Sequence, residues 1–210
     1  RAMARRIVEE LTTDARVEVS SEGVRLARAL PELASPLVPE FLEHQTERRQ
    51  ILGLRCLVNA DSGLLKRVWQ LMDSSSTALR LESIKCLGRI KQRSSRTVQG
   101  LRRLLRSQQP ELISSEILWS LRKILGSGCL EDVEYVLQAE KRTLVLGNAV
   151  QLVERLVLTD WSIERESLSA VLDAMDALAK DAKSTRELAA VAAAARLRIE
   201  ARFIAASRRS

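Results

Sequence analysis

Apolar and polar residues follow one another along most of the chain with the period of an α-helix. Within residues 62–73, for example, Leu65, Val68 and Met72 fall at intervals of three and four residues. This spacing places them on one helical face. Runs with the two-residue alternation of a half-buried strand are missing. The pattern therefore predicts a protein built from amphipathic helices.

One helical segment recurs along the chain at nearly constant intervals. Four stretches align without gaps, at successive offsets of 30, 34 and 32 residues. A period of this size is typical of arrays of helical repeats. The stretches are Arg48–Ala60, Ala78–Ile90, Leu112–Ile124 and Leu144–Leu156. The apolar positions that coincide are Leu54, Ile84, Leu118 and Val150 in one row and Leu57, Leu87, Leu121 and Val153 in another.

Each recurring segment follows another amphipathic stretch, so the predicted unit is helix, turn, helix. Turn-forming residues separate the two helices of a unit at Asp73-Ser74-Ser75-Ser76, and they separate successive units at Asp61-Ser62-Gly63 and Gly126-Ser127-Gly128. The first helices are expected in Val38–Gln45, Ser62–Asp73, Ser94–Arg106 and Leu130–Ala139. An N-terminal unit is expected from Ala2–Leu11 and Glu22–Leu30, and two longer C-terminal helices from Ser162–Ala182 and Thr185–Ala206, joined near Lys183-Ser184. Ser162 is the expected N-cap of the first of these two.

The second helices carry a resemblance to a known class. Residues 79–90 match the pattern V-R-x-x-A-x-x-A-L-G-x-I at Leu79, Arg80, Ile84, Leu87, Gly88 and Ile90, and residues 24–33 are similar. This pattern resembles the second helix of HEAT and armadillo repeats. Other units depart from it, since Gln50 and Ser114 replace Arg80, and Val58 and Arg122 replace Gly88. The resemblance implies a right-handed superhelix used for binding, with second helices lining its concave face.

These observations predict an all-α protein of the alpha-solenoid class. We expect four to five HEAT-like helical hairpins followed by a longer C-terminal helical hairpin. The predicted domains are a repeat array over residues 1–158 and a hairpin over residues 159–210 that packs on the end of the array.

Positive charge is concentrated in one segment. Residues 80–106 contain nine Lys and Arg against Glu82 alone, a net charge of +8, whereas the whole chain has +7. On the helix expected in residues 94–106, the arginines fall opposite the apolar face and should point largely to solvent. We expect a basic ridge, suited to phosphates or carboxylates. Its members are Arg89, Lys91, Arg93, Arg96, Arg102, Arg103 and Arg106.

Trp119 is the aromatic residue most suited to contact a partner. In the repeat alignment it takes the position of Arg55, Lys85 and Gln151, and its helical neighbours are polar. A tryptophan on a polar surface is a natural interface anchor, although it could also fold against the next repeat. We expect Trp119, Arg55, Lys85 and Arg122 to form a partner-binding surface.

Reactive groups do not gather in any recognisable motif. Cys56, Cys86 and Cys129 are widely spaced, which disfavours a zinc site and fits a reducing compartment in the cytoplasm or an organelle matrix. A pair of His44 with Cys56 lacks a third, orienting group. The sequence therefore predicts a protein that is not an enzyme and has no cofactor, metal or small-molecule substrate, although a small enzyme with a hidden site remains a distant alternative.

Two functions stay open. The first is a non-catalytic scaffold that binds a protein partner in a larger assembly. The second is a module that binds RNA backbone in a ribonucleoprotein or organellar ribosome, because scattered aromatic residues disfavour base-specific recognition. Charged residues interrupt every apolar run, so no membrane insertion is expected. The chain begins at Arg1 without methionine, which fits a removed presequence or a truncated chain.

Overall fold

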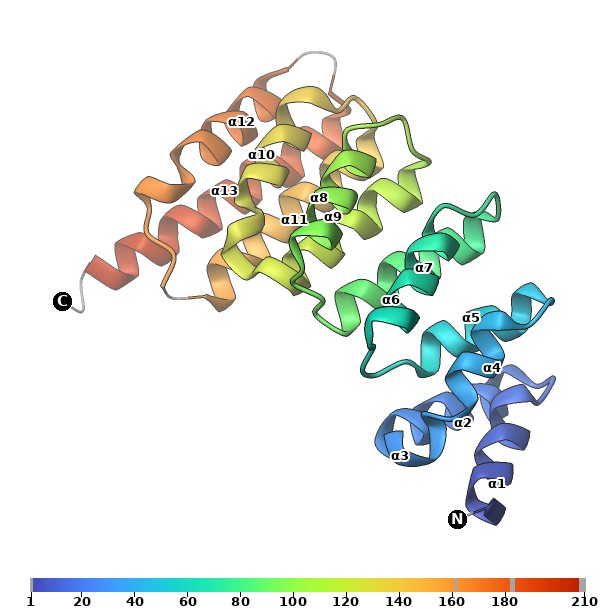
Figure 1. Cartoon of the computed structure of the whole chain (residues 1–210). Helices are drawn as coiled ribbons and strands as arrows, with labels where there is room; N and C mark the ends of the chain where they lie inside the picture. Colours follow the sequence, from blue (N-terminus) through green and yellow to red (C-terminus); the bar gives the residue numbers. More distant parts are fainter. Residues whose placement is uncertain (1, 161, 182–183, 208–210) are drawn as a thin grey trace. The chain divides into compact units, whose positions relative to one another are not determined.

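The structure is a computed structural model that describes residues 2–160, 162–181 and 184–207. These residues form helices and no strands, as Figure 1 shows. The α-helices are α1 (Ala2–Thr13), α2 (Val17–Ala29), α3 (Pro31–Ala34), α4 (Leu37–Glu43), α5 (Glu47–Cys56), α6 (Ser62–Met72), α7 (Thr77–Arg89), α8 (Ser95–Leu105), α9 (Glu111–Leu125), α10 (Leu130–Ala139), α11 (Thr143–Thr159), α12 (Ser169–Lys180) and α13 (Arg186–Ser207). Short 3-10 turns, η1 (Gly126–Cys129) and η2 (Glu166–Leu168), precede α10 and α12.

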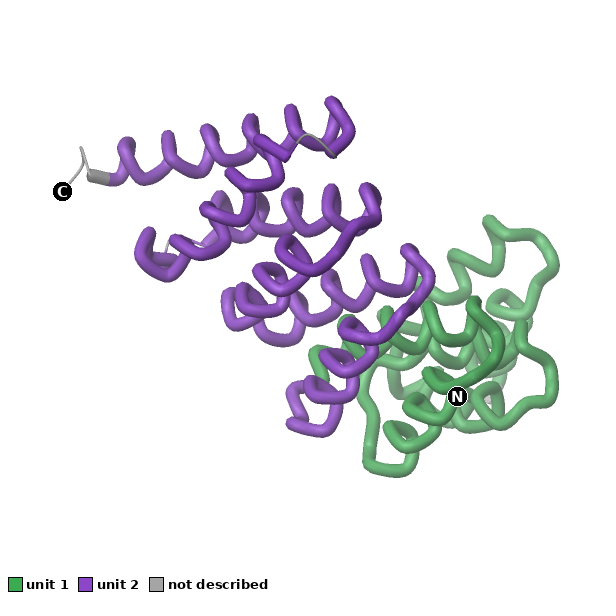
Figure 2. The backbone as a smooth tube through the Cα atoms, turned by 90° about the horizontal axis from the view of Figure 1, so that it is seen from above, with its two compact units in different colours: residues 1–92 green, residues 93–210 purple. Residues whose placement is uncertain are grey.

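The chain divides into two compact units, residues 1–92 and 93–210, which Figure 2 colours separately. In unit 1, α1 packs on α2, α4 on α5 and α6 on α7, and the second helices α2, α5 and α7 contact one another in sequence. In unit 2, α8 pairs with α9, α10 with α11 and α12 with α13, and α9, α11 and α13 form the corresponding row. The predicted boundary between residues 158 and 159 falls inside unit 2 and stays a prediction.

The predicted repeat register matches the core of both units. The equivalent residues Leu54, Ile84, Leu118 and Val150 are at most 1% exposed. The second row, Leu57, Leu87, Leu121 and Val153, is buried as well. Stacked hairpins bury these positions between successive second helices, which is the architecture of an alpha-solenoid.

Local chemistry sets where several helices begin and end. Asp61 caps α6, because its carboxylate accepts a hydrogen bond from the Leu64 N–H at 2.8 Å. Ser76 and Ser94 cap α7 and α8 in the same way. After α9 the backbone turns through Gly126 at a φ of +61°, a conformation that glycine adopts without steric cost.

The first C-terminal helix begins later than predicted. The Ser162 hydroxyl donates to the Asp160 carboxylate at 2.6 Å and caps no helix, and α12 begins only at Ser169. Arg202, on α13, is buried and donates to the Asp160 carbonyl at 3.0 Å and to the Ile163 carbonyl at 3.1 Å. Hydrogen bonds from the Arg202 side chain of α13 to backbone carbonyls therefore fix this irregular segment. Ala182, the predicted end of the first C-terminal helix, and Lys183, the first residue of the predicted junction Lys183-Ser184, lie outside the described residues.

Candidate partner-binding surfaces

Three arginines from successive second helices of unit 1 gather around one buried carboxylate. Glu82 of α7 has a side chain only 9% exposed, and it contacts Arg55 Nε at 3.4 Å and Arg89 Nη1 at 3.8 Å. Arg28 of α2 donates from Nε to the Arg55 carbonyl at 2.6 Å. We call these four residues, Arg28, Arg55, Glu82 and Arg89, the arginine cluster.

Two of the arginines also complete the end of α5. The last carbonyls of a helix lack intrahelical partners and carry partial negative charge. Arg89 donates to the Leu54 carbonyl, and Arg28 donates to the Arg55 carbonyl, both in the last turn of α5. These hydrogen bonds tie α2 and α7 to the helix that lies between them.

Positive charge is in excess in the arginine cluster. Burial, and next the charge of Arg89, lower the pKa of Arg28, which means that the site disfavours a further cation. Cys56 and Cys86 lie close by and are buried and free, and burial raises the pKa of each thiol to about 11. Both are therefore neutral near pH 7 and offset none of the positive charge.

Trp119 lies on the second-helix surface of unit 2, half-buried on α9. The guanidinium carbon of Arg122 lies 5.7 Å from the centre of its ring, and that of Arg155, on α11, lies 5.9 Å away. Cations at these distances are attracted to the face of the indole. We call Trp119, Arg122 and Arg155 the Trp119 patch.

The other residues predicted beside Trp119 occupy matching positions on their own helices. Arg55 is exposed on α5, Lys85 is half-buried on α7, and Gln151 is exposed on α11. The repeat alignment thus identifies equivalent surface positions on the second helices of each unit, Arg55 and Lys85 in unit 1 and Trp119 and Gln151 in unit 2. Arg28 and Glu82 escaped the sequence prediction, although each lies 27 residues from Arg55, close to one repeat length.

The predicted basic ridge is only partly exposed. In unit 1, Arg89 is half-buried in the arginine cluster, and Lys91 is exposed. In unit 2, Arg93, Arg96, Arg103 and Arg106 are exposed along α8 and the residues before it. Arg102 was expected to point to solvent, and this is wrong. Its Nε lies 2.8 Å from the carboxylate of Asp132 on α10, a side chain only 3% exposed.

The pair of Arg102 and Asp132 joins the first helices of neighbouring hairpins. Burial raises the pKa of Asp132, and Arg102 opposes that rise, while the hydrogen bond to Asp132 raises the pKa of Arg102. The guanidinium therefore has a fixed internal partner. It is a structural group and contributes little to a free basic surface.

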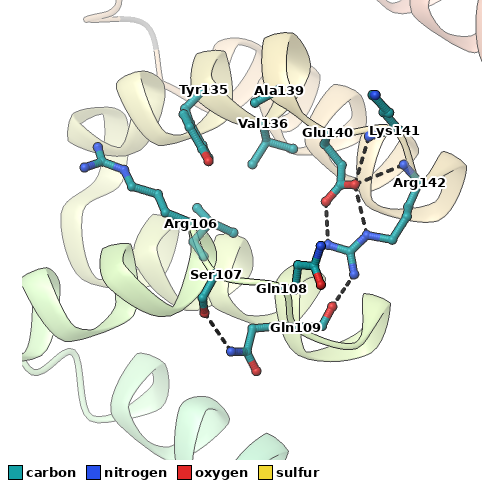
Figure 3. A pocket seen from close by; sticks show the side chains of 11 residues that line it. Arg106, Ser107, Gln108, Gln109, Tyr135, Val136, Ala139, Glu140, Lys141 and Arg142 are labelled. Carbon is teal, nitrogen blue, oxygen red and sulfur yellow. Dashed lines mark hydrogen bonds and ion pairs between the residues drawn. The ribbon is translucent and has the colours of Figure 1, made fainter.

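A cavity of about 530 Å³ lies between the end of α8 and the end of α10. Figure 3 shows Arg106 and Tyr135 at one end, with the guanidinium 5.4 Å from the ring centre, and the pair of Glu140 and Arg142 at the other. Arg142 holds Glu140 at 2.5 Å and also donates to the Gln109 carbonyl. Hydrogen bonds from Arg142 lower the pKa of Glu140 to about 2. A carboxylate so firmly ionised is a poor general acid or base near pH 7.

The described residues show neither a metal centre nor a membrane segment. They contain no group of three or more His, Cys, Asp and Glu placed to hold a metal ion. His44 Nδ1 accepts from the Thr46 N–H at 3.0 Å in the turn after α4. Across the ranges that the structure covers, every helix is too short or too polar to cross a bilayer.

Comparison with known proteins identifies the fold. No family model and no curated protein matches the chain. A designed armadillo repeat protein, solved in complex with the peptide (KR)4, aligns at a TM-score of 0.52 and 18% identity over 93% of this chain and 98% of its own. The crystal structure of an engineered protein aligns at 0.52 and 15% identity over 95% and 97%. The chain therefore has an armadillo-like alpha-solenoid fold, which confirms the predicted fold class.

Proposed function

We propose that the protein is a non-catalytic helical-repeat scaffold that binds a protein partner within a larger assembly through the Trp119 patch. The observation that supports this most is the half-buried indole of Trp119 between two arginines on adjacent second helices. Tryptophan and arginine are the residues most enriched where interfaces concentrate their binding energy. The designed armadillo protein of similar fold was itself solved with a peptide bound.

The fold suits this role because successive second helices present one row of side chains to a long ligand. Within unit 1, Arg55 and Lys85 occupy such a row, and within unit 2, Trp119 and Gln151 do, so a partner segment on either unit could contact more than one repeat. We place the scaffold in a reducing compartment of the cell, because its three cysteines are buried and free.

The test is purification of the tagged full chain from its source cells, followed by identification of whatever copurifies. Trp119→Ala is expected to lose the partner at moderate salt. Leu197→Ala is the matched control, because Leu197 is a large apolar residue of unit 2 that is 71% exposed on α13, a helix that contains no residue of the patch. A partner that stays bound to Trp119→Ala and to wild type equally would contradict the proposal.

A second candidate function is binding of RNA backbone. It is favoured by the exposed Arg93, Arg103 and Arg106 beside α8. Binding of this kind weakens steeply with salt, because phosphate contacts release counterions. The variant Arg103→Glu/Arg106→Glu should then bind RNA much more weakly. Arg102 is not changed in this variant, because it pairs with the buried carboxylate of Asp132. If this variant and wild type retain the same RNA affinity, this candidate is excluded.

A further inference from the structure

The arginine cluster of unit 1 contains more positive charge than its one carboxylate balances. Two guanidinium groups contact one carboxylate and a third lies close by, which gives a net charge of +2 within four side chains. They come from α2, α5 and α7, three second helices in sequence. Positive charge that is partly removed from water is costly unless an anion accompanies it.

The hydrogen bonds within the arginine cluster also do not use all of its guanidinium N–H donors. Each guanidinium has several N–H donors in a planar fork. Arg28 donates to one carbonyl and Arg89 donates to another, while both Arg55 and Arg89 approach Glu82. The buried Nε of Arg89 has no hydrogen-bond partner among the described residues.

A purely structural role accounts for two of the arginines and not for the third. Arg28 and Arg89 complete the end of α5, as described above. Arg55 has a side chain that is 49% exposed, and among the described residues the one polar contact of this side chain is the long 3.4 Å approach to Glu82. Its guanidinium therefore presents free N–H groups to solvent beside two further cations.

The character of the surrounding surface favours an acidic peptide over a nucleic acid. The helices α2, α5 and α7 contain no aromatic residue on which a base could stack. The three arginines lie close together around the end of α5, whereas backbone phosphates of RNA favour a line of cations. Carboxylates match the planar fork of arginine and can accept two parallel hydrogen bonds.

We propose that the arginine cluster is a subsite for the carboxylates of an acidic segment of the protein partner, with Arg55 as the main contact. This inference rests on the proposed function, because it names the chemistry of the partner where the partner crosses unit 1. The two uncompensated charges select a segment with more than one Asp or Glu.

The test measures binding of a fluorescent peptide that alternates Glu and Gly to the purified full chain by anisotropy, at several salt concentrations. We expect saturable binding that weakens as salt screens the charges. Arg28→Ala/Arg55→Ala should weaken it at least about tenfold, because charge-assisted hydrogen bonds are lost. Because Arg28 also supports α5, Arg55→Ala alone is the second variant, and thermal melting checks that each variant is folded.

The matched control is Arg25→Ala/Arg49→Ala. It removes the same charge from the same two helices, α2 and α5, at exposed positions outside the cluster. We expect it to change the affinity by less than about twofold. If it weakens binding as much as Arg28→Ala/Arg55→Ala does, only net charge matters, and the proposed subsite is wrong.

Three further outcomes would also overturn the inference. They are equal binding of a peptide that alternates Lys and Gly, tighter binding of a single-stranded RNA that depends on the same arginines, and wild-type affinity of the folded Arg55→Ala variant. The proposed function is tested separately, since Trp119→Ala should leave affinity for the acidic peptide unchanged. Loss of the copurified partner therefore reports on the Trp119 patch, and loss of the peptide reports on the arginine cluster.

Discussion

Each unit buries one carboxylate among its described residues, and the two have very different surroundings. In unit 1, Glu82 faces Arg55 and Arg89, with Arg28 close by. In unit 2, Asp132 is held by Arg102 at 2.8 Å, and the other acid near that arginine, Glu131, is 86% exposed. Glu82 therefore has more arginines around it than its one negative charge can balance, whereas Asp132 has a single close arginine.

The difference separates two uses of charge in one fold. A balanced pair such as Arg102 and Asp132 joins two hairpins and is satisfied once they pack. An unbalanced group such as the arginine cluster keeps a net charge after packing, so it still favours an anion from outside. Counting cations along the sequence cannot distinguish the two, because Arg55 and Arg102 both appear there as surface arginines.

The largest expected effect comes from breaking the balanced pair. Arg102→Ala should lower the free energy of unfolding by about 2–3 kcal/mol, because it leaves the Asp132 carboxylate buried and unpaired. Urea denaturation of the full chain measures this. Arg103→Ala, the neighbouring exposed arginine, is the control and should stay within about 0.5 kcal/mol of wild type. Equal losses for both variants would show that the pair is not structural.

A smaller loss of stability is expected on changing Glu82, the carboxylate of the arginine cluster. The same change should raise the affinity for the acidic peptide. Glu82→Gln should cost about 1–2 kcal/mol of stability, because a charged acceptor of two arginines is lost. The same change removes the one negative charge of the cluster, so affinity for the acidic peptide should rise. Exposed Glu22→Gln, which removes an acid from α2, is the control and should change neither quantity appreciably. Weaker peptide binding by Glu82→Gln would contradict the excess of positive charge.

The smallest effect concerns a paired carboxylate nearer to solvent. Glu140 has its pKa lowered from 4.5 to about 2, mainly by hydrogen bonds from Arg142. A lowered folded-state pKa stabilises the protein above pH 4.5, and this stabilisation disappears as pH falls toward 2. Glu140→Gln should therefore reduce stability at pH 7 by about 1 kcal/mol and make the curve flatter below pH 4.5. Melting temperatures across this pH range measure it, and an unchanged slope would exclude the assignment.

The repeat register could be predicted from sequence because it depends on local periodicity. Apolar residues such as Leu54 and Ile84 recur at the repeat length, and burial between stacked helices is the consequence. The same register placed Arg55 and Trp119 on second helices. The first residues of helices with a clear N-cap, such as Asp61 before α6, could also be predicted from the sequence.

Contacts between hairpins were harder to predict from the sequence, because they depend on the direction in which long side chains point. Arg102 lies among exposed arginines in sequence, yet Asp132 lies 30 residues later and draws it inward. Opposite charges one repeat apart are the signal that could have revealed this pair. At Ser162 the prediction failed because the hydroxyl donates to Asp160, a local alternative to capping.

The hydrogen bonds of Arg202 have a consequence for the order in which the protein is made. The carbonyls of Asp160 and Ile163 leave the ribosome 42 and 39 residues before the arginine that binds them. Parts of a chain that are made early can fold while synthesis continues. The irregular segment after α11 has to wait for α13, so this part of the chain acquires its hydrogen bonds only after a helix about 40 residues further on has been translated.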